Sequence, residues 1–492
     1  MNVSRLNQSQ IKSPAPLLIR GAELLSGAVF DLRIADGKIV EKSPHLQSRL
    51  NERVIEAGGH LLIPGLQDHH LHLFATASAR ESIYCGPPAV TNEQQLRQVL
   101  ESAPGRGWLR GIGFHDSVCA ELDRYWLDRV CPDRPVRIQH RSGMMWVLNS
   151  KALQQLTLKP QEDWPDGVER NSDGELSGRF YNLDSWLGDY LPRAWPSLLD
   201  VSKELARYGV TRVTDTGVNN DKATWEALNA ASERHELMQR ALVMGTESLN
   251  QLTAINPERM NVGPLKLYLR EVDLPDLDNL VKRIGAAHDV GRAVAVHCVT
   301  LVELYYVLEA FSQAGVLLGD RIEHASVADT YAIERLAALG ITVVTQPHFI
   351  SERGDQYLTD VDKDDVARLY RGASFLKAGV RLAAGSDAPY GSLDPWASMK
   401  AATIRQTRSG IVMAAEERLT PLQALALFGG TSSQPGIDVN GLKVGDRADL
   451  CLLDTSWQQQ SQELCASHVA LTLCGGRVIF ESHGRRLRKA SG

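Results

Sequence analysis

The middle of the chain alternates apolar runs of strand length with amphipathic stretches of helical length. Several of the apolar runs are nearly continuous, as expected for parallel strands that are covered on both faces. Stretches such as DLDNLVKRIGAAHD and TYAIERLAALG separate them with helical periodicity. Eight strand–helix units in series predict an α/β fold of the (β/α)8 TIM-barrel type rather than an open doubly wound sheet. The predicted strands are GHLLIPGLQDHH, VTRVTDTG, RALVMGTE, PLKLYLR, AVAVHC, DRIEHAS, ITVVTQP and VRLAAGSDA.

The two ends of the chain have a different texture from the middle. Short alternating runs with turn signals appear in PLLIRGAELLSGAVFDLRIADGKIVEK near the start and in GLKVGDRADLCLLD and VALTLCGGRVIFES near the end. This pattern predicts antiparallel strands that form a composite β-sandwich from both termini. The strand spacing breaks once, between Asp68 and Thr211, which predicts an insertion after the first barrel strand that contributes to the substrate pocket. The expected parts are residues 1–62 and 434–492 for the sandwich, 63–78 and 200–433 for the barrel, and 79–199 for the insertion.

Composition and charge narrow the class of protein. Hydrophobic residues make up 43% of the chain and charged residues 23%, which is ordinary for a soluble globular protein and excludes disorder. A net charge of −6 provides no basic field for nucleic acid, and no apolar run is long enough to cross a membrane. The polar start of the chain lacks a signal-peptide core, and the 7 cysteines include no CxxC pair. We therefore expect a cytoplasmic protein that binds neither nucleic acid nor membranes.

Metal-binding residue types lie at the carboxyl ends of the predicted strands, where the active sites of such barrels are found. His70 and His72 are two residues apart on one strand and therefore face the same side. His297, His324 and Asp387 end three later strands. A shared metal ion would remove the cost of burying these groups without partners, which is several kcal/mol. Imidazole ligands suit zinc, and also manganese, iron or nickel.

Lys266 lies inside the apolar strand GPLKLY and bears on the number of metals. A buried ammonium beside two divalent cations is strongly disfavoured. A neutral lysine amine can instead react with CO2, and the resulting carbamate can bridge two metals. The alternatives are a lysine that extends out of the barrel or one that binds a substrate carboxylate. The preferred prediction is a binuclear centre, with zinc as the first choice, and a carboxylated lysine.

These residues together resemble the amidohydrolase superfamily, whose first-strand signature is similar to PGLQDHHLHL. Within it the chain is most similar to the YtcJ-like, or N-substituted formamide deformylase-like, branch. Two segments that we expect to line the substrate cavity differ from the pattern of that branch. The stretch Gly143-Met144-Met145-Trp146 lacks a histidine that the branch usually has there. The stretch LYLREVDLPDLDN after Lys266 is shorter than the corresponding segment of the branch and differs from it in charge. The supporting segments are VCPDRPVRIQHRSGMMWVLNSKAL, DGVERNSDGELSGRFYN, TVVTQPHF, LAAGSDAPYGSLDPWASMKAAT and ERLTPLQALALFGGTSSQ.

The resemblance implies a metal-dependent hydrolase that cleaves a C–N bond of a small molecule, such as an amide, an N-acyl or N-formyl group or a cyclic amide. The expected ligands are His70, His72 and Asp387 for one metal and His297 and His324 for the other, with carbamylated Lys266 between them. The predicted attacking group is a metal-activated hydroxide. The predicted catalytic residues are His324 and Asp387, of which Asp387 acts as base and then as acid.

Two other functions stay open at this point. A heterocycle deaminase is the main rival, although its usual glutamate three residues after the fifth-strand histidine is replaced by Thr300 here. A catalytically silent binding or regulatory relative is the second. A homodimer is compatible with the fold, but no sequence feature establishes one. Arg270 is a candidate for pairing with a substrate carboxylate or for a surface salt bridge. The predicted substrate-binding residues are His115, Arg141, Trp146, Arg270, His348 and Tyr390.

Overall fold

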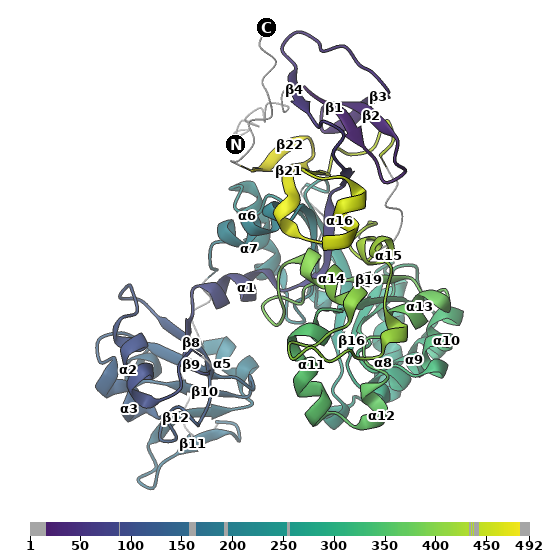
Figure 1. Cartoon of the computed structure of the whole chain (residues 1–492). Coiled ribbons are helices and arrows are strands. Elements are labelled where there is room, and N and C mark those ends of the chain that lie inside the picture. Colours follow the sequence, from purple (N-terminus) through teal and green to yellow (C-terminus); the bar gives the residue numbers. More distant parts are fainter. Residues whose placement is uncertain are drawn as a thin grey trace, which may run out of the picture. The chain divides into compact units, whose positions relative to one another are not determined.

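The computed structural model of the chain describes residues 16–87, 89–156, 164–190, 195–252, 256–431, 434, 436 and 442–482. The chain forms two compact units (Figure 1). The first unit combines the segment that ends at Leu73 with the segment that starts at Leu198, and the second unit is Phe74–Ser197.

Eight parallel strands form the sheet at the centre of the first unit, which confirms the predicted barrel class. They pair in the order β19-β18-β17-β16-β15-β14-β13-β6, so each strand lies beside the one that precedes it in the sequence. All eight predicted apolar runs contribute a strand. The strands are β6 (Leu66–Leu71), β13 (Val210–Asp215), β14 (Arg240–Gly245), β15 (Met260–Tyr268), β16 (Val294–Cys298), β17 (Arg321–His324), β18 (Thr342–Thr345) and β19 (Leu382–Ala384).

Contacts between the first and last strands bring the two edges of this sheet together. The backbone N–H of Asp387 donates to the carbonyl of His70 at 2.7 Å, and that of His72 donates to the carbonyl of Ala388 at 2.9 Å. Asp68 reinforces the junction, since its carboxylate accepts hydrogen bonds from the N–H groups of His70 and Ser386, each at 3.0 Å. The segments that follow β6 and β19 are therefore held side by side.

Helices surround the strands of this sheet (Figure 1). Side-chain caps begin several of them: Asp221 caps α7, Thr300 caps α9 with a capping box, and Asp329 caps α10. The helices of the first unit are α6 (Leu199–Arg207), α7 (Lys222–Glu233), α8 (Leu277–Asp289), α9 (Leu301–Ala314), α10 (Thr330–Leu339), α11 (Phe349–Asp360), α12 (Lys363–Val366), α13 (Gly372–Lys377), α14 (Pro395–Ile404), α15 (Pro421–Ala426) and α16 (Trp457–Glu463). Short 3-10 helices are η2 (Glu247–Leu249), η3 (Glu271–Asp273), η4 (Ala415–Glu417) and η5 (Ala466–His468), and α1 (Leu73–Arg80) follows β6.

The ends of the chain form two four-stranded sheets, of which one contains strands from both ends, and their purple and yellow segments lie side by side in Figure 1. They share an apolar core in which Ile19, Leu32 and Ile55 lie with Leu450 and Leu471. The domain limits drawn from the sequence stay predictions. The first sheet has the order β3-β2-β1-β4, with β1 (Leu17–Glu23), β2 (Val29–Ala35), β3 (Lys38–Ser43) and β4 (Arg53–Glu56). The second has the order β22-β21-β20-β5, with β5 (Leu62–Pro64), β20 (Leu450–Leu453), β21 (Val469–Cys474) and β22 (Arg477–Glu481).

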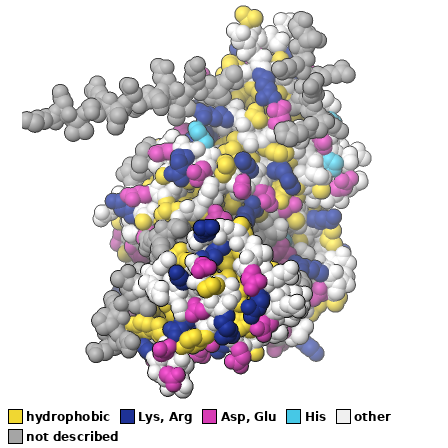
Figure 2. All heavy atoms as spheres, turned by 90° about the vertical axis from the view of Figure 1, so that its left-hand side faces the viewer, with side chains coloured by type: hydrophobic (Ala, Val, Ile, Leu, Met, Phe, Trp, Pro, Cys, Tyr) yellow, Lys and Arg dark blue, Asp and Glu magenta, His cyan; other side chains and the backbone are white. Residues whose placement is uncertain are grey.

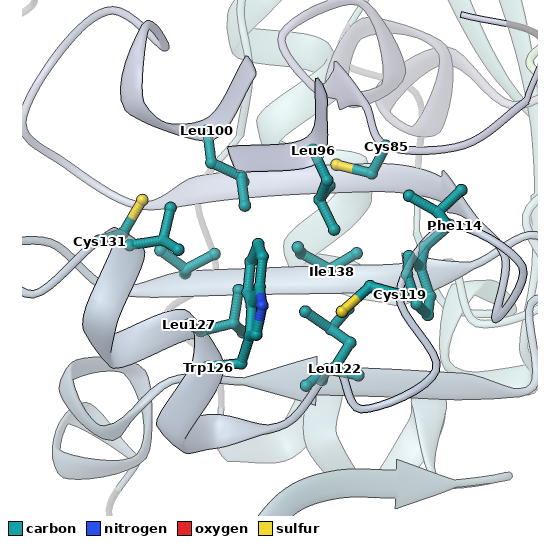
Figure 3. Packing of buried hydrophobic residues seen from close by; sticks show 14 of the residues in the cluster. Cys85, Leu96, Leu100, Phe114, Cys119, Leu122, Trp126, Leu127, Cys131 and Ile138 are labelled. Atoms are coloured by element: carbon teal, nitrogen blue, oxygen red, sulfur yellow. The ribbon is translucent and has the colours of Figure 1, made fainter. Parts of the chain in front are cut away.

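The second unit has its own six-stranded sheet and its own core. Helices α2 (Glu93–Glu101) and α3 (Arg124–Val130) are capped by Asn92 and Asp123. Figure 3 shows Trp126 and Leu127 of α3 and Leu96 of α2 packed against Ile138 of the sheet. The sheet has the order β11-β12-β10-β9-β8-β7, with β7 (Ile83–Tyr84), β8 (Leu109–Phe114), β9 (Val136–His140), β10 (Met145–Leu148), β11 (Val168–Arg170) and β12 (Leu176–Tyr181). Its other helices are α4 (Ser150–Gln155) and α5 (Asp184–Tyr190).

The surface agrees with the balanced charge of the sequence. On the face drawn in Figure 2, basic and acidic side chains are interspersed rather than separated by sign. Within the described ranges, none of the helices has both the length and the hydrophobicity that crossing a membrane requires. The expected location in the cytoplasm stays a prediction.

Candidate metal centre

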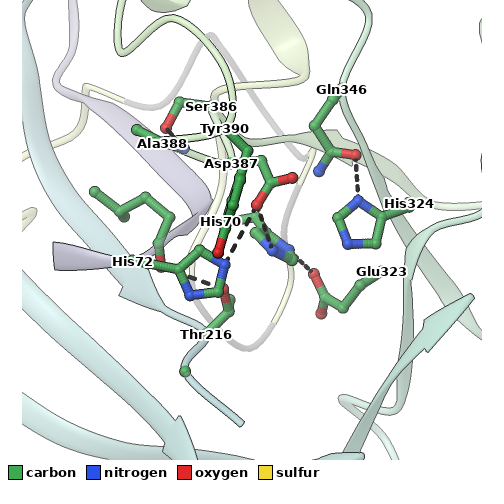
Figure 4. A network of polar contacts seen from close by, with 12 residues as sticks. His70, His72, Thr216, Glu323, His324, Gln346, Ser386, Asp387, Ala388 and Tyr390 are labelled. Carbon is green, nitrogen blue, oxygen red and sulfur yellow. Dashed lines mark hydrogen bonds and ion pairs between the residues drawn. The ribbon is translucent and has the colours of Figure 1, made fainter. Parts of the chain in front are cut away.

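His70, His72 and Asp387 meet where β6 ends, close to the segment that follows β19 (Figure 4). Oδ1 of Asp387 lies 3.4 Å from Nε2 of His70 and 3.3 Å from Nε2 of His72. The two imidazole rings are 5.6 Å apart between their centroids and nearly perpendicular. The spacing of two residues on one strand therefore brings both histidines to the same carboxylate, as expected from strand geometry.

His324 and His297 extend this cluster across neighbouring strands. The ring of His324 lies 4.7 Å from the ring of His70 and 4.5 Å from the ring of His297. One donor atom from each of His70, His324 and Asp387 lies within 4.8 Å of the other two, which is a spacing that could hold a metal ion. The structure thus brings together residues that lie far apart in the sequence.

Two members of the cluster have backbone conformations that L-residues rarely adopt. His324 has a φ of 71° and Asp387 a φ of 51°. Such left-handed positions cost on the order of 1–3 kcal/mol each and often occur at functional sites. In a regular strand, adjacent residues face opposite sides. The left-handed turn at His324 explains how both His324 and its neighbour Glu323 contact the same residue, His70.

Lys266 lies on β15, and its side chain is buried in the same region as the histidines, with only 4% of the residue exposed. Its Nζ forms no hydrogen bond within the described part of the chain. Burial lowers the pKa of this amine to about 8, although the carboxylates of Glu323 and Asp387 oppose the shift. A buried nitrogen without an acceptor is an incomplete arrangement. A ligand or a covalent modification at Lys266 would complete it.

Hydrogen bonds to Nδ1 orient two of the histidines. Glu323 accepts a hydrogen bond from Nδ1 of His70 and is itself paired with Arg321, which is also buried. Oε1 of Gln346 lies 2.7 Å from Nδ1 of His324. With Nδ1 engaged, Nε2 of each ring faces the cluster as a potential donor to a metal, the arrangement that metal-binding histidines usually show.

The charges of these groups follow from burial and from their neighbours. Burial disfavours the charged form of His70, but the carboxylates of Glu323 and Asp387 outweigh it and raise the His70 pKa. Burial also opposes ionisation of Asp387, yet hydrogen bonds from His70 and His72 hold its pKa well below the usual range. Burial lowers the pKa of His324 to about 4, so this imidazole is neutral at pH 7. The neutral imidazole of His324 and the ionised carboxylate of Asp387 are the forms that bind divalent metals, whereas His70 would release its proton when a metal binds.

The donor set fits a transition metal. Imidazole nitrogens and a carboxylate oxygen are the protein ligands that zinc, manganese, iron and nickel accept. Such atoms come from residues at or just after the carboxyl ends of four barrel strands. These residues are His70, His72, His297, His324 and Asp387. The amine of Lys266, which has no hydrogen-bond partner in the described ranges, does not fit as a simple ligand.

Three predicted substrate-binding residues belong to the barrel unit: His348, Tyr390 and Arg270. Tyr390 is 62% exposed, and its ring lies 5.7 Å from that of His72. His348 is buried, and its ring nitrogens lie 3.0 Å from the Ser398 hydroxyl and 3.0 Å from the Ser386 carbonyl. In this arrangement both ring nitrogens of His348 contact protein groups, one of them in the segment before Asp387. A role of His348 or Tyr390 in binding substrate stays a prediction.

The region after β15 contains Arg270 and a residue that the sequence reasoning did not select. Arg270 is exposed and immediately precedes η3. Tyr268 is 51% exposed, and its ring lies 4.3 Å from that of His297. Tyr268 lies two residues after Lys266, so its position on the same strand could have indicated it. Gln346 was also not selected from the sequence, although its position directly after β18 could have indicated it.

The remaining three predicted residues lie in the second unit. Nδ1 of His115 is 2.7 Å from the Ser117 hydroxyl, and its ring stacks on that of His140 at 5.7 Å. Trp146 is buried, and the guanidinium groups of two arginines lie over its ring. Arg141 is exposed and follows β9. Their part in substrate binding stays a prediction.

A barrel of parallel strands with histidines and a carboxylate at its carboxyl end is an enzyme architecture, and comparisons with known proteins identify the class. A model of the amidohydrolase family matches residues 53–480. The chain therefore belongs to the amidohydrolase family, which confirms the resemblance seen in the sequence, and it is a hydrolase.

Two curated relatives span most of the chain. The N-substituted formamide deformylase of Arthrobacter pascens is 26% identical over 82% of this chain and 84% of its own length. The putative amidohydrolase YtcJ of Bacillus subtilis (strain 168) is 24% identical over 87% of this chain and 90% of its own. Both belong to the branch that the sequence motifs indicate.

Solved structures show the same fold. An uncharacterized metal-dependent hydrolase from Pyrococcus horikoshii OT3 aligns with a TM-score of 0.75 and 21% identity, covering 90% of this chain and 98% of that one. A second, from Pyrococcus furiosus, aligns with a TM-score of 0.71 and 22% identity, covering 90% and 99%. At these identities the likeness concerns the fold.

Proposed function

We propose that this protein hydrolyses the C–N bond of a small amide-type molecule, such as an N-formyl or N-acyl amine or a cyclic amide, with the help of divalent metal ions. The observation that carries the proposal is the convergence of four imidazoles and one carboxylate beside Lys266, whose buried amine has no hydrogen-bond partner among the described residues. Membership of the amidohydrolase family and the similarity to a formamide deformylase support the choice of bond.

His70, His72 and Asp387 would hold one metal, and His297 and His324 would hold the other. Metal ions bound there would polarise a carbonyl group and lower the pKa of a water molecule. Lys266 would link the two positions after carboxylation. In that reaction the neutral amine nitrogen forms a bond to the carbon of CO2, and the electron pair of one C–O π bond moves onto oxygen to give the carboxylate. The nitrogen then releases one proton to solvent.

The chain's own residues would move the proton during hydrolysis. The Asp387 carboxylate is ionised, and Oδ1 already accepts contacts from two imidazoles. It would take the proton of the attacking water and deliver it to the leaving nitrogen, as a base and then as an acid. Glu323 and Gln346 would keep the rings of His70 and His324 oriented throughout. His324 would contribute to catalysis by its place beside the reacting carbonyl group.

The structure adds an argument against the deaminase alternative. The position three residues after His297 is Thr300, whose side chain caps α9 and accepts a hydrogen bond from the N–H of Glu303. Glu303 in turn accepts hydrogen bonds from the N–H groups of Val299 and Glu271, at 2.6 Å and 2.8 Å. This segment therefore stabilises the start of a helix, and Thr300 provides no carboxylate for proton transfer.

The test combines metal content with a substrate panel. Protein purified after growth with zinc and bicarbonate should contain about two metals per chain by elemental analysis. It should release the amine from N-formyl and N-acyl amines or open cyclic amides. About one metal per chain, with ammonia released from aminoheterocycles only, would favour the deaminase. Full metal loading without hydrolysis of any amide, ester or lactone would contradict the proposed activity.

A further inference from the structure

The outer face of the barrel is incompletely covered at one position. Within the first unit, an α-helix follows β13, β15, β16, β17, β18 and β19. After β14, the described residues 246–252 and 256–259 form only the 3-10 helix η2 (Glu247–Leu249). In a (β/α)8 barrel each such helix covers the outside of the strands. Its absence from these described residues leaves the outer side of β14 and β15 open to another occupant.

A cavity of about 550 Å³ lies at this position. Leu242, Leu249 and Leu252 provide apolar walls, and the volume falls within the range of small-molecule sites. Arg240 in the wall is the first residue of β14, and Arg292 in the wall precedes β16. Leu249, Asn250 and Leu252 in the wall follow the carboxyl end of β14, and none of the proposed metal ligands lines the cavity. It is separate from the proposed active site.

The lining of the cavity is positively charged. It includes three arginines and, among the described residues, neither aspartate nor glutamate. Arg292 donates to the carbonyls of Gly263 and Thr246 at 2.9 Å and 2.7 Å and to the side chain of Asn250 at 2.6 Å. Arg240 donates to the carbonyl of Glu258 at 2.8 Å and lies 3.5 Å from a carboxylate oxygen of Asp449, outside the lining. These two arginines are already held in place by protein groups.

Arg212 is different from the other two. It is the register partner of Arg240 on the neighbouring strand β13. Its side chain makes no hydrogen bond or ion pair with any described residue, and its Nε is buried. Burial lowers the pKa of this guanidinium, and Asp449 opposes the shift. A buried donor without an acceptor destabilises the fold, so an oxyanion in the cavity would be stabilised there.

We propose that this cavity binds a small organic anion that carries a carboxylate or phosphate group and an apolar part. Arg212 would pair with the oxyanion through two parallel hydrogen bonds, as guanidinium groups commonly do. Arg240 would add positive charge beside it, and the three leucines would contact the apolar part. The site would be a second ligand site of the enzyme, independent of which bond the metal centre hydrolyses.

Titration calorimetry on the full-length protein tests this proposal with three probes of equal chain length. Octanoate and octyl phosphate should bind with one site per chain. The anion with the higher affinity identifies whether the site prefers a carboxylate or a phosphate head group. Octylamine, with the opposite charge, should not bind. Absence of binding tighter than about 10 mM for both anions would overturn the proposal.

Two variants locate the site. Arg212→Gln should weaken binding of the preferred anion by about 10-fold or more, since a hydrogen bond to a charged group is lost. Asn261→Asp places a negative charge in the lining with almost no change in side-chain size, and it should weaken binding of the anion similarly. The matched control is Arg408→Gln, which removes an exposed arginine that does not line the cavity and should leave affinity unchanged. Equal affinity of both variants and the wild type would contradict the assignment, and circular dichroism would establish that each variant is folded.

Discussion

Oε1 of Gln346, directly after β18, lies 2.7 Å from Nδ1 of His324, the last residue of β17. The two residues are 22 positions apart in the sequence and meet because their strands are neighbours in the barrel. With Nδ1 as the hydrogen-bond donor, Nε2 of His324 is the nitrogen available to a metal. Gln346 is therefore a positioning residue for the proposed centre.

Replacing Gln346 should weaken metal binding without removing a ligand. Gln346→Leu deletes the acceptor of the His324 hydrogen bond, and loss of such a partner typically costs 10- to 100-fold in metal affinity or activity. Competition of the loaded protein with a chelator measures the change. Gln346→Glu keeps an acceptor at the same place and serves as the matched control. If Gln346→Leu retains metal as tightly as the wild type, Gln346 does not position the ligand.

Asp387→Asn should separate metal binding from turnover. The amide keeps an oxygen that can face His70 and His72 but cannot accept a proton at pH 7. We expect kcat to fall by about 10²- to 10⁴-fold, the usual contribution of a general acid–base. Metal content should stay close to that of the wild type by elemental analysis. A variant with nearly normal kcat would exclude Asp387 from the proton transfer.

Lys266 tests whether the centre contains a carbamate. Lys266→Arg keeps a long cationic side chain but cannot be carboxylated in the same way, so the metal content should fall from about two to about one per chain or less. In the wild type, loading with ¹³C-bicarbonate and zinc should give a carbamate signal in the ¹³C NMR spectrum. The Lys266→Arg protein is the control for that signal. A wild-type protein that binds two metals without the signal would contradict the bridging role.

A pH-dependent contribution to stability is expected far from the centre, at His468. Nδ1 of His468 lies 2.9 Å from Asp454, and its Nε2 lies 3.0 Å from Glu463. Partial burial disfavours the charged imidazole, but these carboxylates outweigh it and raise the His468 pKa. Because the folded-state pKa is raised, the stabilisation is complete below about pH 6.5, the unfolded value, and disappears as pH rises through the folded value.

The difference in thermal midpoint between the wild type and His468→Gln measures this contribution. The wild type should have the higher midpoint near pH 5.5, and the two midpoints should approach each other by pH 9. Measurement at pH 9 is the internal control, because the stabilisation disappears as pH rises through the folded value of the pKa. A difference that grows with pH would have the wrong sign for this ion pair.

Local patterns in the chain were sufficient to predict the strands of the barrel. Each strand is a short apolar run, and hydrophobic periodicity depends on neighbouring residues only. The same reasoning located His70, His72, His297, His324, Asp387 and Lys266 near strand ends, and the structure brings these residues together. Their binding of metal, and the domain limits drawn from the sequence, stay predictions.

Other features depend on contacts that no local pattern contains. Tyr268 approaches the His297 ring because β15 and β16 pair in a particular register, in which these two residues are partners. Strict strand alternation would have placed Glu323 and His324 on opposite faces, yet both contact His70 because the backbone turns at His324. The sheet of the second unit was not predicted either, since its strands are short and combine two parallel pairings, β7 with β8 and β8 with β9, with antiparallel ones.

Hydrophobic periodicity and residue type thus determined the barrel, the family and the kinds of side chain at the ends of its strands, because these properties are carried by short stretches of chain. Tertiary structure decided which nitrogen of His70 and of His324 faces the cluster and which carboxylate or amide holds each ring. It also decided that Arg212, beside a cavity, has no hydrogen-bond partner among the described residues. Those outcomes depend on strand register and on the closure of the sheet, which join residues separated by up to hundreds of positions.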